Sequence, residues 1–538
     1  MAAAPARADR QDQALLSAYA AARAADSKGD SSRAARGYAA VLAAAPGNPV
    51  LASRALGQAV VAGDRKLALQ AARSLARNGQ LTADARLLLL GEALESRNAK
   101  AAAQHVEAIT GDKVFAFMAP VLRAWVAFDA RKGDPLALLA AAQAEPLAAG
   151  YAAEHRPLML LAMGEHQQGA AELLAMTGEP SGRAARLRIA GAALLARKGD
   201  RERALTLLEG AEPALAAARR LVEAGRPLPG EIADASAGIA EFLVRLAVDL
   251  HRQDIERVAL AYARLSTFMA PGNSETWLVT SELLAAAGNP REAIAVLARV
   301  RADDPFAANA EDARVKLLAA AGDSQAALAQ AEAAVKGPAA SAASWTRLGD
   351  LYNQLERLDE AAAAYGQAIT LLNAGGGTQP EWALHLLQGG ALERAGRWPQ
   401  AKAALQAAYR LAPDQPVVLN YLGYAQLERR ENQGEAMRLI AQAAKLQPDS
   451  PEITDSLGWA YFLRGDLGQA IPLLEKAVAG GPADPEINEH LGDAYYRAGR
   501  RIEARFAWGA ALTFAEAKDQ PRLRGKIETG LAPATAAR

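Results

Sequence analysis

The sequence of 538 residues contains no cysteine, few aromatic residues and no net charge. Without cysteine, disulfides, a cysteine nucleophile and zinc or iron–sulfur sites with cysteine ligands are excluded. Hydrophobic residues make up 51% but aromatic ones only 5%, so the apolar content is mainly alanine, leucine and valine. Basic and acidic residues number 60 each, which excludes the overall positive charge that attracts nucleic acid. Because alanine and leucine favour helices, we predict an all-α protein.

The sequence also lacks a long hydrophobic run. No stretch approaches the ~20 consecutive apolar residues that a membrane-spanning helix needs, so no transmembrane segment is expected. The first eight residues, Met1–Ala8, resemble the small-residue stretch around a signal cleavage site, with an initiator methionine in front. We therefore expect an exported protein without its signal peptide. The alternative is an ordinary alanine-rich N-terminus, and residues 1–11 are expected to be disordered.

A repeat of about 34 residues is the strongest pattern in the chain. One copy begins with Ser344–Tyr352 and continues to Ala361, Tyr365 and Ala368. Further copies keep the same register and are marked by Trp277, Gly288 and Pro305; by Gly389, Gly396 and Pro413; by Leu422, Gly423 and Pro448; by Gly458, Gly465 and Pro482; and by Gly492, Gly499 and Trp508. Each copy predicts two helices. A small residue lets them approach closely, a glycine follows the first helix, and a proline ends the second.

This pattern resembles the tetratricopeptide repeat (TPR) family. The resemblance implies a right-handed superhelix, an α-solenoid of stacked antiparallel helix pairs, because one repeat cannot bury its apolar face alone. The repeats are degenerate in the N-terminal half. We expect N-terminal TPR-like repeats over 12–80, divergent helical repeats over 81–238, a regular array over 239–512, and a capping helix with a disordered tail over 513–538.

No pattern for catalysis or cofactor binding stands out. The six histidines show no His-Glu-x-x-His spacing, and the chain has no Gly-x-Ser-x-Gly or Gly-x-Gly-x-x-Gly motif. His490 lies alone on the first helix of a repeat, which favours a surface or interface role over metal binding. We expect no catalytic residue, no cofactor and no metal, and therefore a protein that is not an enzyme.

Three C-terminal repeats concentrate aromatic and acidic residues on their first helices. Spacings of four and three place each trio on one helical face, which the superhelix would turn toward its concave groove. Since aromatic residues are enriched in binding hot spots, we predict a groove that binds a segment of a partner protein. Its residues are Asn420, Tyr424 and Leu427; Asp455, Trp459 and Phe462; and Glu489, Asp493 and Tyr496. The alternative is that Trp459, Phe462 and Tyr496 pack between adjacent repeats.

Several segments are close to those of long exported TPR proteins of Gram-negative bacteria. They are Val418–Tyr424, Asp455–Trp459, Asn488–Tyr496 and Arg500–Phe506. This resemblance implies a periplasmic scaffold or adaptor of the cell envelope. It would bind one or more envelope proteins, with peripheral association with outer-membrane components as an option and no nucleic acid. The alternative is a structural accessory subunit of a larger complex, cytoplasmic in location, that binds through its N-terminal half or its convex face.

Overall fold

The computed structural model describes residues 5–178, 181–210, 212–337, 340–374 and 379–531. These residues form 30 α-helices and two 3-10 helices, with no strand among them, so the predicted all-α fold of paired helices is confirmed. Contacts divide the chain into two units, Met1–Ser344 (the N-terminal unit) and Trp345–Arg538 (the C-terminal unit). The domain boundaries expected from the sequence mark changes in how regular the repeats are, which is a different property from the contacts that separate these two units. Those boundaries therefore stay predictions.

The helices of the N-terminal unit are α1 (Pro5–Ser27), α2 (Ser31–Ala44), α3 (Pro49–Ala62), α4 (Arg65–Arg77), α5 (Ala83–Glu95), α6 (Ala99–Thr110), η1 (Ala116–Met118), α7 (Ala119–Ala130), α8 (Pro135–Ala140), η2 (Ala141–Ala144), α9 (Pro146–Met163), α10 (His166–Met176), α11 (Gly182–Arg197), α12 (Arg201–Leu207), α13 (Pro213–Glu223), α14 (Ala235–His251), α15 (Glu256–Met269), α16 (Ser274–Ala286), α17 (Pro290–Leu297), α18 (Ala307–Ala320) and α19 (Ser324–Lys336).

The helices that follow are α20 (Ala342–Gln354), α21 (Leu358–Asn373), α22 (Glu381–Arg394), α23 (Trp398–Leu411), α24 (Pro416–Glu428), α25 (Gln433–Leu446), α26 (Pro451–Leu463), α27 (Leu467–Gly480), α28 (Pro485–Arg497), α29 (Arg501–Phe514) and α30 (Gln520–Thr529). None of the helices in the described residues is at once long and apolar enough to cross a bilayer.

The chain ends differ from expectation where the structure describes them. The first helix begins at Pro5, so residues 5–11, expected to be disordered, are helical. Proline at the start of a helix and alanine within it both favour that conformation. Residues 1–4, Gly375–Gly377 and the tail over 532–538 lie outside the described residues.

The C-terminal unit repeats one packing arrangement. Each first helix (α22, α24, α26, α28) packs on the second helix that follows it, and α26 also packs on both α24 and α28. The small residue of each pair allows this approach: a Cβ on Gly458 would lie 2.8 Å from Leu474 Cγ, and one on Gly492 would lie 2.4 Å from Trp508 Cδ1. Between the helices, Gly465 takes a φ of 81°, the left-handed conformation expected there.

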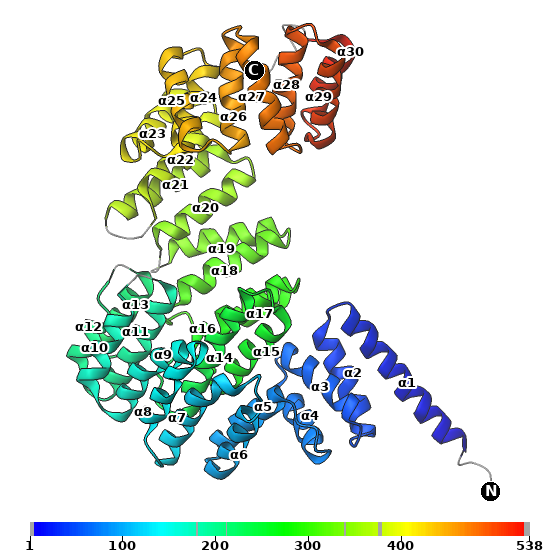
Figure 1. Cartoon of the computed structure of the whole chain (residues 1–538), viewed down its shortest axis with the longest axis vertical. Coiled ribbons are helices and arrows are strands. Elements are labelled where there is room, and N and C mark those ends of the chain that lie inside the picture. The colour runs from blue at the N-terminus through cyan, green and yellow to red at the C-terminus, as the bar shows by residue number, and fades with distance from the viewer. Residues whose placement is uncertain (1–4, 179–180, 211, 338–339, 375–378, 532–538) are drawn as a thin grey trace. The chain divides into compact units, whose positions relative to one another are not determined.

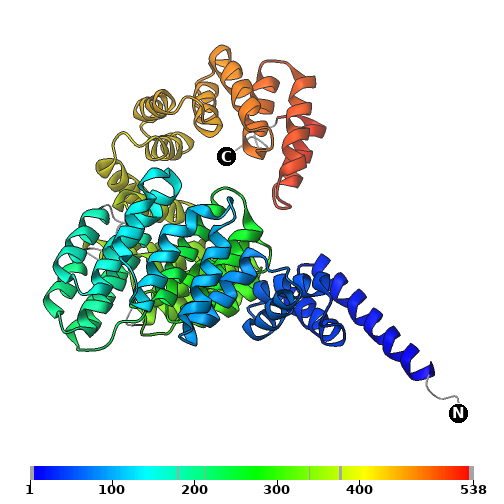
Figure 2. The same cartoon turned by 60° about the horizontal axis from the view of Figure 1, so that its bottom comes forward.

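The N-terminal unit contains a packing arrangement that its sequence does not predict. Helices α3, α5, α7 and α9, the first members of successive pairs, contact α14 and α15. Figure 1 shows α14 and α15 in green on the inner side of the curve that these helices form, and Figure 2 shows the same helices from another direction. Arg264 Nε of α15 donates a 2.8 Å hydrogen bond to the carbonyl oxygen of Val61 at the end of α3. The inner side of this array is therefore filled by the chain itself.

A buried indole brings α14 close to α7. Trp125 of α7 is fully buried, and a Cβ on Gly238 of α14 would lie 2.1 Å from Trp125 Cε2, so only glycine fits. The Trp125 Nε1–H donates to His155 Nδ1 of α9 at 3.1 Å. Burial lowers the pKa of His155 to about 4, which leaves its ring neutral and able to accept this bond.

Charged side chains are buried where α9, α11, α14 and α16 meet. Arg183 of α11 pairs with three carboxylates, those of Glu154, Glu241 and Glu275, the last at 2.7 Å. Arg186 adds a 3.0 Å pair to Glu241. Burial, together with Glu241 and Glu154, raises the pKa of Glu275 to about 7 although the arginines oppose this shift. Glu241 keeps its charge because Arg186 and Arg183 outweigh burial and hold its pKa at about 2.

Candidate partner-binding surface

The nine residues predicted to line a groove lie on α24, α26 and α28, the first helices of three successive repeats. Three of them, Asn420, Tyr424 and Asp455, line a cavity between these helices. The other six lie beside or beneath it, in contact with neighbouring repeats or with α30. That a partner contacts these nine residues stays a prediction. Their contacts within the chain show which of their side chains are accessible to a partner.

The aromatic residues of α26 are packed inside the unit. Trp459 is 2% exposed, and its ring lies between those of Phe462 and His490, with centroids 4.5 and 4.0 Å away. Its Nε1–H donates to Glu428 Oε1 of α24 at 2.7 Å. Leu427 belongs to the same buried cluster. This is the packing between repeats that the sequence left open as the alternative, and it makes a rigid layer beneath the cavity.

The residues of α28 are covered by the last helix, α30. Glu489 forms an ion pair with Lys526 Nζ at 2.6 Å and another with Arg522. Asp493 pairs with Lys526 and accepts a 2.9 Å hydrogen bond from Trp508 Nε1. The ring of Tyr496, which is half-buried, lies 5.5 Å from that of Trp508. These side chains hold the end of the array together.

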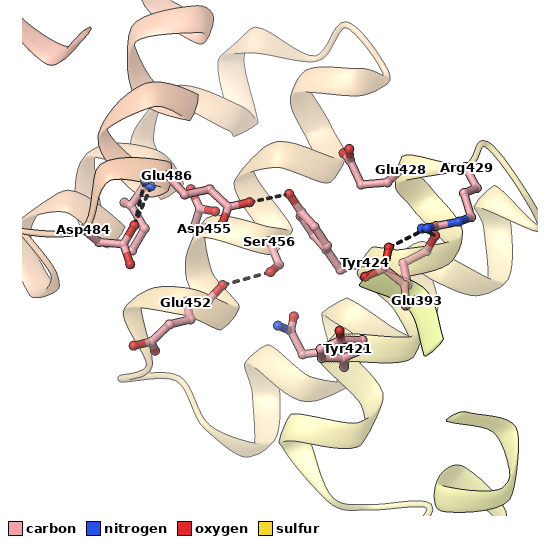
Figure 3. A pocket seen from close by; sticks show the side chains of 13 residues that line it. Glu393, Tyr421, Tyr424, Glu428, Arg429, Glu452, Asp455, Ser456, Asp484 and Glu486 are labelled. Carbon is pink, nitrogen blue, oxygen red and sulfur yellow. Dashed lines mark hydrogen bonds and ion pairs between the residues drawn. The ribbon is translucent and has the colours of Figure 1, made fainter. Parts of the chain in front are cut away.

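The cavity itself has a volume of about 630 Å³ and is open to solvent. Figure 3 shows Tyr424, Asp455, Ser456 and Glu486 around it. Its lining comes from four first helices and comprises Glu393, Asn420, Tyr421, Tyr424, Ala425, Glu428, Arg429, Glu452, Asp455, Ser456, Asp484, Glu486 and Ile487. A cavity of this size can hold a few side chains of another molecule.

The electrostatic character of the cavity is acidic. Six of its lining residues are carboxylates and one, Arg429, is a cation. Arg429 is already paired with Glu393, which leaves the remaining carboxylates to dominate the surface. Because these charges come from several helices, they converge on one space rather than spreading along one exposed face. Such a surface attracts positive charge and repels negative charge.

Two polar contacts fix the walls of the cavity. The Tyr424 hydroxyl of α24 donates to Glu486 Oε1 of α28 at 2.9 Å and so bridges across α26, a contact visible in Figure 3. Burial and the nearby Glu486 and Glu428 carboxylates raise the pKa of Tyr424 well above its usual value, so its proton stays in place. Tyr424 therefore presents its ring to the cavity in a fixed orientation.

Asp455 and His490 form the second contact. His490 Nδ1 lies 2.8 Å from Asp455 Oδ2, with both side chains buried. Burial alone would lower the pKa of His490, but the Asp455 carboxylate, with help from Glu486 and Asp493, raises it to about 8. The imidazole is therefore positively charged near neutral pH. The lone histidine is an interface residue between repeats.

Several lining residues were missed by the sequence reasoning. Glu452 and Glu486 occupy the same position of successive repeats, 34 residues apart and directly after a proline at the start of the first helix. That recurring Pro-Glu pair was a signal that could have found them. Tyr421, Glu428 and Asp484 carried no comparable pattern, because they reach the cavity only through the way the repeats stack.

A family model identifies the type of repeat in part of the chain. A family model described as "Tetratricopeptide repeat" matches residues 313–375, 386–451 and 456–521. Among solved structures, the chain is similar to a tetratricopeptide repeat protein from Parabacteroides merdae, with 15% identity, coverage of 47% of this chain and 97% of that one, and a TM-score of 0.40.

Two further solved structures show the same likeness. The APC/C hetero-tetramer Cut9–Hcn1 contains a chain with 15% identity, coverage of 96% of both chains and a TM-score of 0.39. A thermophilic TPR protein of Thermus thermophilus has 22% identity, coverage of 35% of this chain and 98% of that one, and a TM-score of 0.30. No protein with a curated description matches this chain.

Proposed function

We propose that this chain, in which a tetratricopeptide-repeat model matches three stretches between residues 313 and 521, binds a segment of a partner protein in the acidic cavity on α24, α26 and α28. Tetratricopeptide-repeat proteins generally mediate protein–protein interactions, and the fold is typically non-catalytic. The role proposed here is accordingly that of a scaffold or adaptor without an enzymatic activity of its own.

One observation carries this proposal. The cavity places tyrosine and carboxylate side chains from three consecutive repeats around one space, above a packed layer that contains Trp459 and Phe462. A rigid floor with aromatic and polar walls holds a peptide at low entropic cost, because few side chains must be ordered on binding. In the N-terminal unit, by contrast, α14 and α15 already contact the inner helices of the array.

We further propose that the partner is a protein of the bacterial cell envelope and that the scaffold acts in the periplasm. The support for this location is the resemblance of Val418–Tyr424 and Asn488–Tyr496 to segments of exported relatives. Association with outer-membrane components would then be peripheral.

A second candidate is an accessory subunit that binds through its second helices. Ile502 and Phe506 of α29 are 69% and 76% exposed and lie four residues apart, on one face of the helix. Two large apolar side chains at this degree of exposure favour contact with another protein at that face. This candidate needs no occupant in the cavity and fits a cytoplasmic location as well.

Site-specific photo-crosslinking in cells separates the two candidates. A photoreactive amino acid is placed at Tyr421, in the cavity, and in a second strain at Phe506, on α29. Our proposal expects a discrete crosslinked protein from the first position, which disappears when Glu452→Arg and Glu486→Arg are combined. Fractionation of the crosslinked cells then tests the periplasmic location. Crosslinking confined to Phe506 supports the accessory subunit instead.

A further inference from the structure

We propose that the cavity selects a basic partner segment by binding an arginine or lysine side chain at the unpaired oxygen of Asp455. This inference rests on the proposed function, since it assumes that a protein segment enters the cavity, and it adds the chemistry by which that segment is recognised. The occupant is thus a peptide with at least one cationic side chain.

Asp455 carries an unsatisfied hydrogen-bond acceptor. Asp455 is 5% exposed and lines the cavity, yet its Oδ1 accepts no hydrogen bond within the described part of the chain, because His490 bonds only Oδ2. Asn420 Oδ1, which lines the same cavity, is also without a donor there. A buried acceptor without a donor costs free energy, so a ligand that brings N–H groups is favoured. Lysine and arginine side chains are donors only.

The charges on the cavity wall favour a cationic occupant. Within the described residues, Arg429 is the one arginine or lysine on the cavity wall, and it is engaged by Glu393. His490 supplies one further positive charge behind Asp455. Four more carboxylates surround the space, so an acidic segment would meet repulsion, whereas a cation would gain charge-assisted hydrogen bonds.

In the last repeat of the same chain, the equivalent carboxylate is paired with cations. Glu489 follows Asp455 by 34 residues and therefore holds the same position in the next repeat. Its carboxylate receives Lys526 and Arg522, which lie four residues apart on α30. In that repeat the chain supplies its own lysine and arginine. At Asp455 the corresponding neighbour is His490, which satisfies one oxygen and leaves the other for a ligand.

The tyrosines of the cavity suit the same occupant. Tyr421 and Tyr424 both line the space, and the Tyr424 ring is fixed by its bond to Glu486. Aromatic faces attract guanidinium and ammonium groups and also cover the aliphatic stem of a long basic side chain. An arginine can stack on a ring while it donates to a carboxylate, which makes it the favoured cation.

Panning of a displayed library of random 12-residue peptides against the full chain tests the inference. We expect bound peptides to be enriched in arginine and lysine. A synthetic binder is then compared with the same peptide carrying citrulline, which keeps the shape of arginine but lacks its charge. The citrulline form is expected to bind about ten- to a hundredfold more weakly, the loss typical of a charge-assisted hydrogen bond.

Variants of the cavity complete the test. Asp455→Asn and Glu452→Gln should each weaken binding of the arginine peptide. Glu528→Gln, at an exposed carboxylate of α30 outside the cavity, should leave that binding unchanged. Glu452 is exposed, so its variant serves even if Asp455→Asn fails to fold. Cavity-binding peptides without basic residues, or equal binding of the citrulline form, would overturn this inference and leave the proposed function standing. If no peptide binds the cavity, both fail.

Discussion

Lys526 of α30 places its ammonium 2.7 Å from Asp493 Oδ2 of α28, and both side chains are buried. The same ammonium lies 2.6 Å from Glu489, and Trp508 Nε1 donates to Asp493 as well. The final helix is therefore attached to the last repeat by charge rather than by apolar contact alone. Neither carboxylate can be left without its cation at low cost.

Replacing this lysine should loosen the end of the array. We expect Lys526→Met to lower the free energy of unfolding of the C-terminal unit by about 3–5 kcal/mol, because Asp493 remains buried without its cation and Glu489 keeps only Arg522. Urea unfolding followed by tryptophan fluorescence measures the change. Lys518→Met, at an exposed lysine just before α30, is the control and should shift stability by less than about 0.5 kcal/mol. Similar losses in both variants would contradict the assigned role of Lys526.

Two glycines near Trp508 should respond oppositely to alanine. In Gly492→Ala the new Cβ would lie 2.4 Å from Trp508, and we expect a loss of about 1–3 kcal/mol from overpacking. Gly509 lies inside α29 with nothing within 4 Å of an added Cβ, so Gly509→Ala should gain up to about 1 kcal/mol in helix propensity. Thermal unfolding of both variants checks the contrast, and a stable Gly492→Ala protein would refute the close approach.

The His490–Asp455 contact should make stability depend on pH. The pKa of His490 is about 8 in the folded chain, above the ordinary value of 6.5. Its contribution is therefore fully present below pH 6.5 and is lost as the pH rises through 8, by about 2 kcal/mol in total. Urea unfolding at pH 6 and pH 8.5 measures this difference. In His490→Gln the difference should shrink by that amount, and an unchanged difference would show that the imidazole is not charged.

Because of Glu275, we expect the stability of the N-terminal unit to depend on pH as well. Its pKa is raised to about 7, so the stability it contributes is present below pH 4.5 and is lost as the pH rises through 7. We expect Glu275→Gln, which keeps a hydrogen-bonding side chain but never ionises, to be more stable than the natural chain at pH 8 by about 2–3 kcal/mol. At pH 5 the two should differ little. Hydrogen exchange of α11 and α16 at both pH values locates the effect.

The repeat could be recognised in the sequence because its small residues are determined by packing within a single helix pair. Gly423, Gly458 and Gly492 recur at 34 or 35 residues, and in each pair the second helix fills the space where a Cβ would stand. The ends of the helices are also determined by nearby residues, such as Pro482 just after α27. Spacing within one pair was sufficient for these features.

What covers a helical face depends on the neighbouring repeat, and spacing within one helix carries no such information. The four-residue step from Asp455 to Trp459 correctly placed both on one side of α26. It could not show that His490 of the next first helix would stack on the indole, whereas Tyr424 would face the cavity. For the same reason only three of the nine predicted residues line the cavity, since its acidic rim assembles from four helices.

The packing of α14 and α15 inside the N-terminal array has a consequence for biosynthesis. Val61 and Arg264 are 203 residues apart, so the surface of α3 that α15 covers is made long before its cover. At 5–20 residues per second, the ribosome leaves that surface waiting on the order of 10–40 s. During this interval the nascent N-terminal repeats expose apolar side chains. A chaperone that binds this chain cotranslationally is expected to engage between the synthesis of α3 and that of α15.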